Sequence, residues 1–358
     1  MKKVTVNISI KYDVLIGRDI LNDAGAYVNE IFGSCRLCVV SDDTVYGIYG
    51  ETVVSSLTCA GFSVCVFTFV PGERSKNMTT VSALLEFMAS EKLTRADVVV
   101  ALGGGVTGDI AGFAASCYMR GVPFIQMPTT LLAAVDSSVG GKTGVNIAQG
   151  KNLAGTFWQP ALVLCDCNTF ATLTNDALLD GIAEIVKYGV IADCDLFEFI
   201  ASGNLSLFTD DNFEQIVEKC VIIKSRFVNG DERDTGNRRY LNFGHTIGHA
   251  IEKCSNYSIP HGQAVALGML HIARASYRLG FSTENCAEKI EQALKQYGFD
   301  LDCGFSADDL CEAALIDKKK AGESITLVLP YKIGDCRLEK MDIRLFKEFV
   351  EGGFNHGR

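Results

Sequence analysis

The sequence predicts two domains, an α/β domain with a mostly parallel sheet in front and an all-helical domain behind. The chain has 358 residues, and a chain longer than about 250–300 residues usually forms more than one hydrophobic core. Its first half alternates β-rich runs with helical stretches, whereas its second half shows apolar residues at helical spacing. This change of pattern near residue 175 predicts domains of residues 1–174 and 175–358.

Short apolar runs rich in β-branched residues predict the strands of the first domain. They follow an N-terminal run, Val4–Ile10, in which apolar and polar residues alternate. The expected strands are Arg36–Ser41, Phe62–Phe69, Asp97–Leu102 and Pro123–Met127, and the expected helices lie near Arg18–Phe32, Met78–Glu91 and Asp109–Met119. Strands that alternate with helices favour βαβ units, whose neighbouring strands run parallel.

Segments of the second domain place apolar residues at i, i+3 and i+4, which is typical of amphipathic helices. The expected helices are Asp176–Val190, Asn212–Val228, Thr246–Cys254, Ala264–Leu279 and Cys286–Tyr297. The sequence contains neither internal repeats nor low-complexity tracts, so we expect no repeat architecture.

Composition and charge exclude several classes of protein. The chain carries 33 Lys and Arg against 43 Asp and Glu, a net charge of −10 that repels phosphate backbones. The alternating N-terminus differs from the continuous apolar segment of a signal peptide. No apolar run approaches the roughly 20 residues that span a bilayer. We therefore expect a soluble, cytoplasmic protein that binds neither nucleic acid nor membrane.

Fourteen cysteines raise the possibility of a disulfide framework. Most lie singly in apolar runs, where Cys behaves as a small hydrophobic residue. Cys35 with Cys38 and Cys165 with Cys167 are the closest pairs, and neither has a second pair at zinc-site spacing. Core packing in a reduced compartment is the simpler interpretation, with a structural zinc or redox site as the alternative.

A glycine-rich turn follows the strand predicted to end at Leu102. Gly103, Gly105 and Gly108 satisfy the pattern G-x-G-x-x-G. Missing Cβ atoms let a backbone approach a pyrophosphate, and the start of the following helix supplies free N–H donors. No Asp or Glu closes the next strand, Phe124–Met127, as the usual dinucleotide-binding order requires. The turn indicates phosphate or dinucleotide binding, with a tight strand-to-helix turn as the alternative.

Three of the five histidines fall within seventeen residues, at His245, His249 and His261. A helix starting near Gly244 places His245 and His249 one turn apart on one face, a spacing suited to a shared metal ion. A catalytic zinc ion needs three protein ligands, so a carboxylate must come from elsewhere. Glu184 lies among apolar residues, where an unpaired carboxylate is costly, and is the candidate. The alternatives are packed histidines and a helix-surface glutamate.

Several cationic residues suggest a site for a small anion in this acidic protein. Lys142 and Lys151 lie in glycine-rich sequence that predicts turns, and Lys224 and Arg238 precede the histidines. The alternative for each is a solvated surface charge. The run Asp317–Lys320 most resembles such a surface, although one of its lysines could point inward.

Taken in order, the motifs closely resemble the 3-dehydroquinate synthase family over roughly residues 40–335. The resemblance rests on Pro71–Lys76, Gly103–Asp109, Pro128–Leu132, Asp136–Asn146, Gly150–Asn152, Ala183–Gly189, Asp231–Arg233, Leu241–Glu252 and His261–Gly262. It implies an NAD-binding α/β domain, a helical metal- and substrate-binding domain, and Zn²⁺ or Co²⁺ in the cleft between them. It also implies a homodimer and closure of the cleft during the reaction.

The resemblance implies roles for individual residues. Glu184, His245 and His261 take the metal-ligand positions, so His249 becomes a substrate or proton-relay residue. The implied NAD contacts are Asp42, Glu73, Lys76, Gly105, Val106, Thr107, Gly108, Asp109, Thr129, Thr130, Lys142, Lys151 and Thr172. The implied catalytic and substrate residues are Lys142, Asn152, Lys187, Lys224, Arg238, Asn242, His249 and Lys318, with Arg120 reaching across a dimer interface to the partner's phosphate site. The family's usual Thr-Leu-Pro-x-Arg-Glu segment departs here at Thr172–Ala177, which leaves the cofactor contacts there open.

The reaction implied by the resemblance belongs to the shikimate pathway of aromatic amino acid biosynthesis. Its substrate is 3-deoxy-D-arabino-heptulosonate 7-phosphate, which is oxidised by NAD, loses phosphate, is reduced again and closes to 3-dehydroquinate. The alternatives are another sugar phosphate cyclase, a metal-dependent polyol dehydrogenase and a non-catalytic metal-binding protein. Substrates of the other cyclases lack a carboxylate, so Arg238, Lys224 and Asn242 favour the first assignment.

Overall fold

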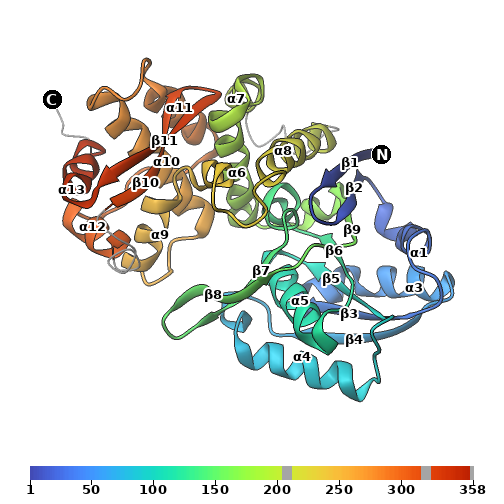
Figure 1. Cartoon of the computed structure of the whole chain (residues 1–358). Coiled ribbons are helices and arrows are strands. Elements are labelled where there is room, and N and C mark those ends of the chain that lie inside the picture. Colours follow the sequence, from blue (N-terminus) through green and yellow to red (C-terminus); the bar gives the residue numbers. More distant parts are fainter. Residues whose placement is uncertain (204–211, 316–323, 355–358) are drawn as a thin grey trace. The chain divides into compact units, whose positions relative to one another are not determined.

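The computed structural model describes residues 1–203, 212–315 and 324–354 (Figure 1). The chain divides into two compact units, Met1–Leu173 and Thr174–Arg358. The boundary expected at residues 174 and 175 lies beside this division. The predicted fold class, an α/β unit followed by a helical unit, is confirmed, with one hairpin in the second unit that the prediction lacked.

The first unit, all of whose residues are described, contains a seven-stranded sheet with the order β1-β2-β9-β6-β5-β3-β4. β1 and β2 pair antiparallel, and every other neighbouring pair is parallel. The strands of this unit are β1 (Lys2–Asn7), β2 (Lys11–Gly17), β3 (Arg36–Asp42), β4 (Ser63–Phe69), β5 (Val98–Gly103), β6 (Phe124–Pro128), β7 (Lys142–Ile147), β8 (Gly150–Phe157) and β9 (Leu162–Asp166). Its helices are α1 (Ala24–Asn29), α2 (Asp43–Val45), α3 (Glu51–Cys59), α4 (Met78–Ser90) and α5 (Gly105–Cys117).

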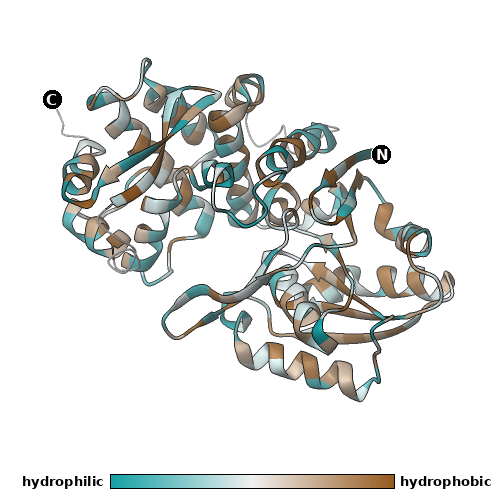
Figure 2. Ribbon diagram, in the orientation of Figure 1, coloured by the Kyte–Doolittle hydropathy of each residue, from teal (hydrophilic) through white to brown (hydrophobic). Residues whose placement is uncertain are grey.

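Apolar side chains on both faces of this sheet explain why helices cover it on both sides. Every residue of β5 is buried, as expected for a central strand of a parallel sheet. α4 and α5 pack against one face through Leu84 and Ile110, and α1 and α3 pack against the other through Val28 and Leu57. The apolar strands and the mixed surfaces of the covering helices are visible in Figure 2.

The order of the strands changes direction beside β3. β4 pairs with one edge of β3 and β5 pairs with the other, so the connections after β3 and after β4 run to opposite sides. Parallel α/β sheets bind ligands at the carboxyl ends of the strands at such a switch point. Here those ends are Asp42 and Gly103.

Two helices of the first unit differ from the prediction. The helix expected near Arg18–Phe32 is only Ala24–Asn29, preceded by a 3-10 turn at Ile20–Asp23. The helix expected from Asp109 already begins at Gly105, because the glycine turn itself forms the first helical turn. The backbone N–H groups of the turn therefore belong to the helix N-terminus.

The second unit is mostly helical. Its helices are α6 (Asn175–Ala192), α7 (Cys194–Ala201), α8 (Asn212–Val228), α9 (His245–Cys254), α10 (His261–Arg278), α11 (Cys286–Tyr297), α12 (Ala307–Leu315) and α13 (Ile343–Gly352). A short 3-10 helix, Asn237–Asn242, precedes α9. The expectation of an all-helical unit needs one correction, because β10 (Ser324–Lys332) and β11 (Asp335–Asp342) form an antiparallel hairpin. No helix among the described residues is long and apolar enough to cross a membrane.

Candidate functional site

Three side chains from three helices of the second unit meet in one cluster. Glu184 lies in the middle of α6, His245 is the first residue of α9 and His261 is the first residue of α10. The potential ligand atoms of these residues all lie within 4.8 Å of one another. The structure therefore brings together the set that the family resemblance implied.

Glycines set the distance between the helices that carry the histidines. A Cβ atom on Gly268 of α10 would lie 2.1 Å from the carbonyl oxygen of Gly244, and one on Gly248 of α9 would lie 3.0 Å from that of Ala264. Gly244 itself has φ of 78°, a left-handed conformation that favours glycine. The glycines beside His245 therefore allow α9 and α10 to pack in close contact.

A third contact fixes the start of α10 against α6. The backbone N–H of Gly262 donates to Asp180 Oδ1 at 2.6 Å, and a Cβ on Gly262 would lie 2.3 Å from the Asp180 Cα. Asp180 lies one turn before Glu184 on α6, and burial raises the pKa of its carboxyl. This contact places His261 next to Glu184.

The geometry of the cluster fits a divalent cation. The Nε2 atoms of His245 and His261 lie 3.4 and 3.6 Å from Glu184 Oε1. Two ligands of a tetrahedral zinc, each about 2.0–2.2 Å from the ion, lie about 3.4 Å apart. Glu184 Oε1 is buried and accepts no hydrogen bond from the described residues. One carboxylate and two imidazoles form a three-ligand set that leaves a fourth position for substrate or water.

The electrostatics of Glu184 and His261 are consistent with this fit. Burial opposes ionisation of Glu184, but the ammonium group of Lys187 and the rings of His245 and His261 hold its pKa well below the usual value. Burial also opposes protonation of His261, but Glu184 and Glu252 raise the pKa of that ring to about 10. The site thus attracts positive charge.

His249 lies apart from the ligand set. Its side chain is 56% exposed, and its Nε2 atom lies 4.0 Å from Glu252 Oε2. The rings of His245 and His249 are 5.5 Å apart, as are the rings of His245 and His261. His249, Glu252 and His261 form a second group of close potential ligands. The i, i+4 spacing therefore predicted two neighbouring histidines but not the carboxylate that distinguishes them.

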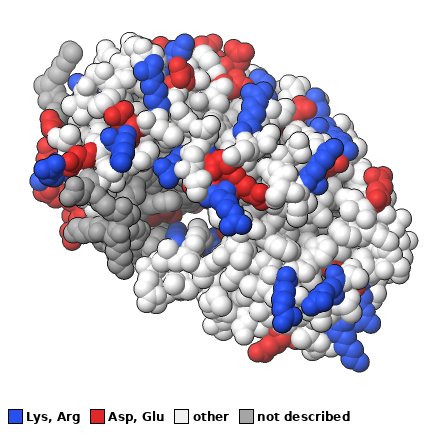
Figure 3. Space-filling model, in the orientation of Figure 1, with Lys and Arg blue, Asp and Glu red and all other residues white. Residues whose placement is uncertain are grey.

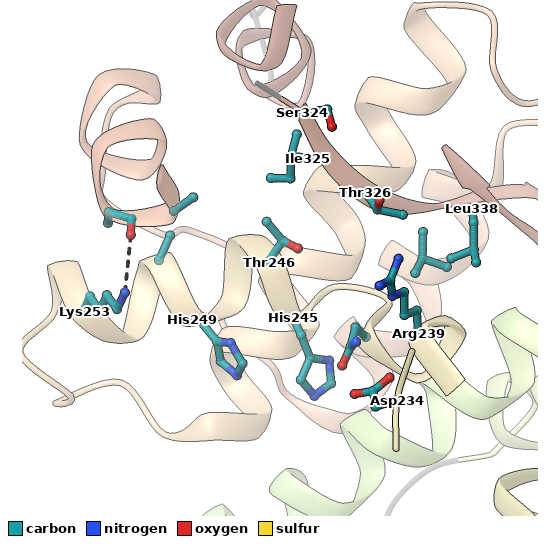
Figure 4. A pocket seen from close by; sticks show the side chains of 15 residues that line it. Asp234, Arg239, His245, Thr246, His249, Lys253, Ser324, Ile325, Thr326 and Leu338 are labelled. Atoms are coloured by element: carbon teal, nitrogen blue, oxygen red, sulfur yellow. Dashed lines mark hydrogen bonds between the residues drawn. The ribbon is translucent and has the colours of Figure 1, made fainter. Parts of the chain in front are cut away.

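A pocket of about 470 Å³ adjoins the histidines within the second unit (Figure 4). His245 and His249 line one side, and the labelled residues of β10 and β11 line another. Asn242 also lines the pocket. Asp234, Arg239 and Lys253 add charge of both signs. Arg239 was not predicted as a site residue from the sequence. It follows Arg238 and lies three residues before Asn242 on the same short helix.

The other substrate candidates of the second unit differ in burial. Lys187 and Lys224 are buried on α6 and α8, and Arg238 is 2% exposed. Arg238 Nη1 donates to the carbonyl oxygen of Glu232 at 2.7 Å, which orients the guanidinium. Asn242 is exposed at the pocket. Lys318 and the rest of the run Asp317–Lys320 lie outside the described residues.

Apart from Lys142 and Lys151, the candidate cofactor residues of the first unit lie where parallel strands end. Asp42 ends β3, Gly105–Asp109 opens the helix after β5, and Thr129 and Thr130 follow β6. Glu73 and Lys76 follow β4, and Thr172 lies in the turn after β9. The usual dinucleotide-binding order requires an acid at the end of a strand beside β5. The sequence has none at the end of β6, but Asp42 ends β3, which also borders β5.

Local contacts make this edge suitable for a dinucleotide. A Cβ atom on Gly104 would lie 2.9 Å from Thr130 Cγ2, so the turn has no room for a side chain. Thr129 Oγ1 is buried and has no hydrogen-bond partner among the described residues. Lys76 Nζ pairs with Asp109 Oδ2 at 2.5 Å, and Asn146 Nδ2 donates to Glu73 Oε1 at 2.7 Å. The backbone and the polar side chains of the turn are thus held in place.

The lysines predicted in turns lie on a hairpin instead. Lys142 begins β7 and Lys151 belongs to β8, which pairs antiparallel with β7. Asn152 on β8 has φ of 54° and its backbone N–H donates to Asn146 Oδ1 at 2.9 Å. Arg120 is exposed, with φ of 69°, in the turn after α5. The expectation that Lys142 and Lys151 lie in turns is therefore wrong, because both lie on strands of the hairpin.

The segment that departs from the family pattern begins the second unit. Thr174 caps α6, since its Oγ1 accepts the backbone N–H of Ala177 at 3.3 Å. Thr172 Oγ1 lies 2.7 Å from the Tyr49 hydroxyl. The departure thus preserves a helix start, and Thr172 remains at the edge where the other cofactor candidates lie.

The structure shows where the surface charges and the cysteines lie. On the face drawn in Figure 3, Lys and Arg are interspersed with Asp and Glu. The described residues include all fourteen cysteines, and none of them forms a disulfide. Cys38, Cys165 and Cys167 are buried, as expected for residues that fill the core, and Cys35 is partly buried. Cys59, Cys117 and Cys194 are exposed, so core packing does not account for all fourteen.

Comparisons with known proteins connect both units to one family. The family described as 3-dehydroquinate synthase N-terminal matches residues 66–180, and the one described as 3-dehydroquinate synthase C-terminal matches residues 181–320. A 3-dehydroquinate synthase of Streptococcus mutans is 42% identical over 355 residues, covering 98% of this chain and 99% of that protein. The enzyme of Clostridium acetobutylicum is 41% identical over 334 residues, covering 92% and 94%.

Solved structures agree in fold. A 2-deoxy-scyllo-inosose synthase complexed with carbaglucose-6-phosphate, NAD⁺ and Co²⁺ is 26% identical, covers 99% of this chain and 100% of its own, and has a TM-score of 0.89. The 2-epi-5-epi-valiolone synthase ValA of Streptomyces hygroscopicus, with NAD⁺ and Zn²⁺ bound, is 26% identical, with coverage of 98% and 97% and a TM-score of 0.88. A probable glycerol dehydrogenase of Sinorhizobium meliloti, at 14% identity and coverage of 95% of both chains, shares the fold with a TM-score of 0.67.

Proposed function

The chain belongs to the 3-dehydroquinate synthase family, and we propose that it converts 3-deoxy-D-arabino-heptulosonate 7-phosphate to 3-dehydroquinate and phosphate. The observation that carries the proposal is the cluster of Glu184, His245 and His261, one buried carboxylate and two imidazoles in the geometry of a catalytic metal site. The same chain places a glycine turn at the switch point of a parallel sheet.

The reaction needs a divalent cation and NAD, and the chain offers candidate residues for both. Glu184, His245 and His261 would hold a divalent cation, Zn²⁺ or Co²⁺, and Asp42, Glu73, Lys76, Gly105–Asp109, Thr129, Thr130, Lys142, Lys151 and Thr172 would hold NAD. When bound, NAD takes up and returns a hydride, and the cation polarises a substrate oxygen as a Lewis acid. Lys187 keeps Glu184 ionised, so the carboxylate is ready to bind a cation.

Cationic residues of the second unit would orient the carboxylate and hydroxyls of the substrate. Arg238 and Lys224 would bind the carboxylate, because a guanidinium offers paired donors to its two oxygens. Asn242 and Lys187 would hold hydroxyl groups.

A second set of residues would bind the phosphate group of the substrate and the phosphate ion that is released. Lys142 and Asn152 on the β7–β8 hairpin would grip it together with Lys318 and with Arg120 from a partner subunit. The substrate's own phosphate would serve as the base for the β-elimination. His249 would move a proton at the substrate rather than bind the cation, since its ring is exposed while the rings of His245 and His261 face Glu184.

The proposal includes a zinc-bound homodimer in the cytoplasm. Carboxylate and imidazole ligands suit zinc, and ValA, 26% identical to this chain, is a structure with Zn²⁺. Fourteen cysteines without a disulfide suit a reducing compartment. Exposed apolar residues near Arg120 and on the hairpin, Met119, Ile147, Leu153 and Phe157, suit contact with a second copy, which light scattering after gel filtration would detect.

One incubation tests the proposed reaction against its alternatives. Purified protein with Co²⁺ or Zn²⁺, the heptulosonate phosphate and substoichiometric NAD should release phosphate over many turnovers, while absorbance from NADH stays low. Equimolar accumulation of NADH would favour a polyol dehydrogenase. Release of phosphate from glucose 6-phosphate or sedoheptulose 7-phosphate, but not from the heptulosonate phosphate, would favour another sugar phosphate cyclase.

A further inference from the structure

Glu252 is a buried acid beside the metal cluster to which the proposed mechanism gives no role. It lies on α9, on the same helix face as His245 and His249 at positions i, i+4 and i+7. Its side chain is 4% exposed. Its Oε1 atom lies 3.6 Å from His261 Nδ1, and its Oε2 atom lies 4.0 Å from His249 Nε2. Each oxygen of one carboxylate therefore faces a different histidine.

The position of Glu252 is unfavourable for the helix itself. α9 ends at Cys254, so Glu252 lies in the last turn, where the negative end of the helix dipole disfavours an acid. Burial adds a cost, because a buried carboxylate must be paired. The contacts with His261 and His249 offset part of these two costs.

The two nitrogens of His261 face two different carboxylates. Nε2 faces Glu184 Oε1 at 3.6 Å, and Nδ1 faces Glu252 Oε1 at the same distance. A ring that carries its proton on Nδ1, directed at Glu252, has its lone pair on Nε2, directed at the ligand cluster. A carboxylate behind a metal-bound histidine fixes the tautomer and orientation of the ring and raises its basicity.

The contact of Glu252 with His249 is the longer of the two. Glu252 Oε2 lies 4.0 Å from His249 Nε2, and the His249 side chain is 56% exposed. The carboxylate therefore acts chiefly on His261, which its Oε1 atom approaches to 3.6 Å.

We propose that Glu252 is a positioning residue, which holds the ring of His261 with Nε2 directed at the cation. This inference rests on the proposed function of Glu184, His245 and His261 as cation ligands. Removal of such a carboxylate typically weakens metal binding by about 10- to 100-fold.

Cobalt binding tests the inference without the use of activity. The dissociation constant for Co²⁺ is measured against a competing chelator, and the visible absorption bands of the bound ion are recorded. E252A should bind Co²⁺ about 10- to 100-fold more weakly and shift the bands. E252Q, which keeps the shape and one acceptor, should lie between E252A and the unsubstituted chain. E284Q is the matched control, since Glu284 lies in the same unit but pairs with Lys289 and accepts the backbone N–H of Ile333.

Further variants separate the two proposals. If the unsubstituted chain binds one Co²⁺ and H261A binds none, the metal site stands. In that case an E252Q protein with a dissociation constant and bands equal to those of E284Q would overturn the role of Glu252 alone. Should E252A fail to fold by circular dichroism, E252Q still decides. A chain that binds no Co²⁺, or H261A that keeps it, would overturn the metal site itself.

Discussion

The two candidate sites of this protein are built from different parts of the chain. In the first unit the site is an edge where parallel strands end, and its central element is a glycine turn in which backbone N–H groups open α5. In the second unit the site consists of side chains, three of which come from three helices. The first depends on local backbone geometry and the second on how helices pack.

This difference determines how each site responds to change. A glycine turn fails when a side chain fills it, whereas a ligand cluster fails when one functional atom is lost. The ring of His245 lies 5.5 Å from the rings of both His249 and His261, so proximity alone does not select the ligands. Glu184 faces His245 and His261, and under the proposed function this carboxylate would select them as ligands.

The largest effect is expected for Glu184→Gln, which breaks the site made of side chains. A neutral amide binds a cation weakly, so bound metal should be lost and turnover should fall by about 10³-fold or more, the several kcal/mol that a Lewis acid supplies. Metal content and phosphate release measure both losses. The thermal midpoint should also fall, since Lys187 loses its buried partner.

Glu288→Gln is the control for that experiment, because Glu288 is exposed on α11 in the same unit. It should match the unsubstituted chain in metal content and rate. A Glu184→Gln protein that keeps one cation per chain and normal turnover would remove Glu184 from the ligand set.

A smaller loss is expected for His249→Ala, which sharpens the distinction between ligand and proton carrier. Removal of a group that moves a proton typically slows a reaction by about 10²–10⁴-fold. The expected fall is in kcat rather than KM, measured by phosphate release at saturating substrate. An unchanged kcat would exclude His249 from proton transfer.

The glycine turn should be broken by Gly104→Val while the metal site remains intact. The new Cβ would lie 2.9 Å from Thr130 Cγ2, and the branched side chain would fill the space above the turn. We expect NAD to bind about 100-fold more weakly, close to 3 kcal/mol, with unchanged metal content. Calorimetric titration with NAD measures the effect. Gly47→Ala, which meets no atom within 4 Å, should bind NAD normally.

The smallest effect concerns His271, a histidine of α10 that lies outside the site. Its Nε2 atom contacts the Val350 carbonyl oxygen at 2.7 Å, and burial lowers its pKa to about 4. Because the folded pKa lies below the ordinary value near 6.5, the neutral ring stabilises the fold above pH 6.5, and this contribution is lost as pH falls toward 4. At pH 5 the loss is about 2 kcal/mol.

Thermal melting at pH 7.5 and pH 5 measures this contribution. The midpoint of the unsubstituted chain should fall between these pH values by several degrees more than that of His271→Gln, which has no titratable ring at this position. Equal shifts for the two proteins would mean that His271 does not titrate in this range. Both should retain metal at pH 7.5, unlike His261→Ala on the same helix.

Much of the fold could be predicted from the sequence because its signals are local. The strands at Arg36–Ser41 and Phe62–Phe69 differ from β3 and β4 by about one residue at one end, since buried parallel strands read as continuous apolar runs. The β10–β11 hairpin was missed, because a short apolar run does not distinguish a strand from a buried helix. Likewise, Lys142 and Lys151 were placed in turns because glycines surround them, although they lie on paired strands.

The candidate sites could be predicted only where local sequence carries them. The glycine turn is a contiguous motif, whereas the acid nearest to it in the sheet, Asp42, lies some sixty residues earlier, because strand order is set by tertiary pairing. Spacing paired His245 with His249, but α6 and α10 bring Glu184 and His261 to the same point. Glu252 was missed, although its place seven residues after His245 puts it on the same face.

Metal content of two single variants tests the central claim most directly. His261→Ala and His249→Ala are purified in parallel, loaded with Co²⁺ and freed of excess ion by gel filtration. If helix packing rather than spacing along α9 selects the ligands, His249→Ala retains about one ion per chain and His261→Ala retains almost none. An ion retained by His261→Ala and lost from His249→Ala would contradict the account.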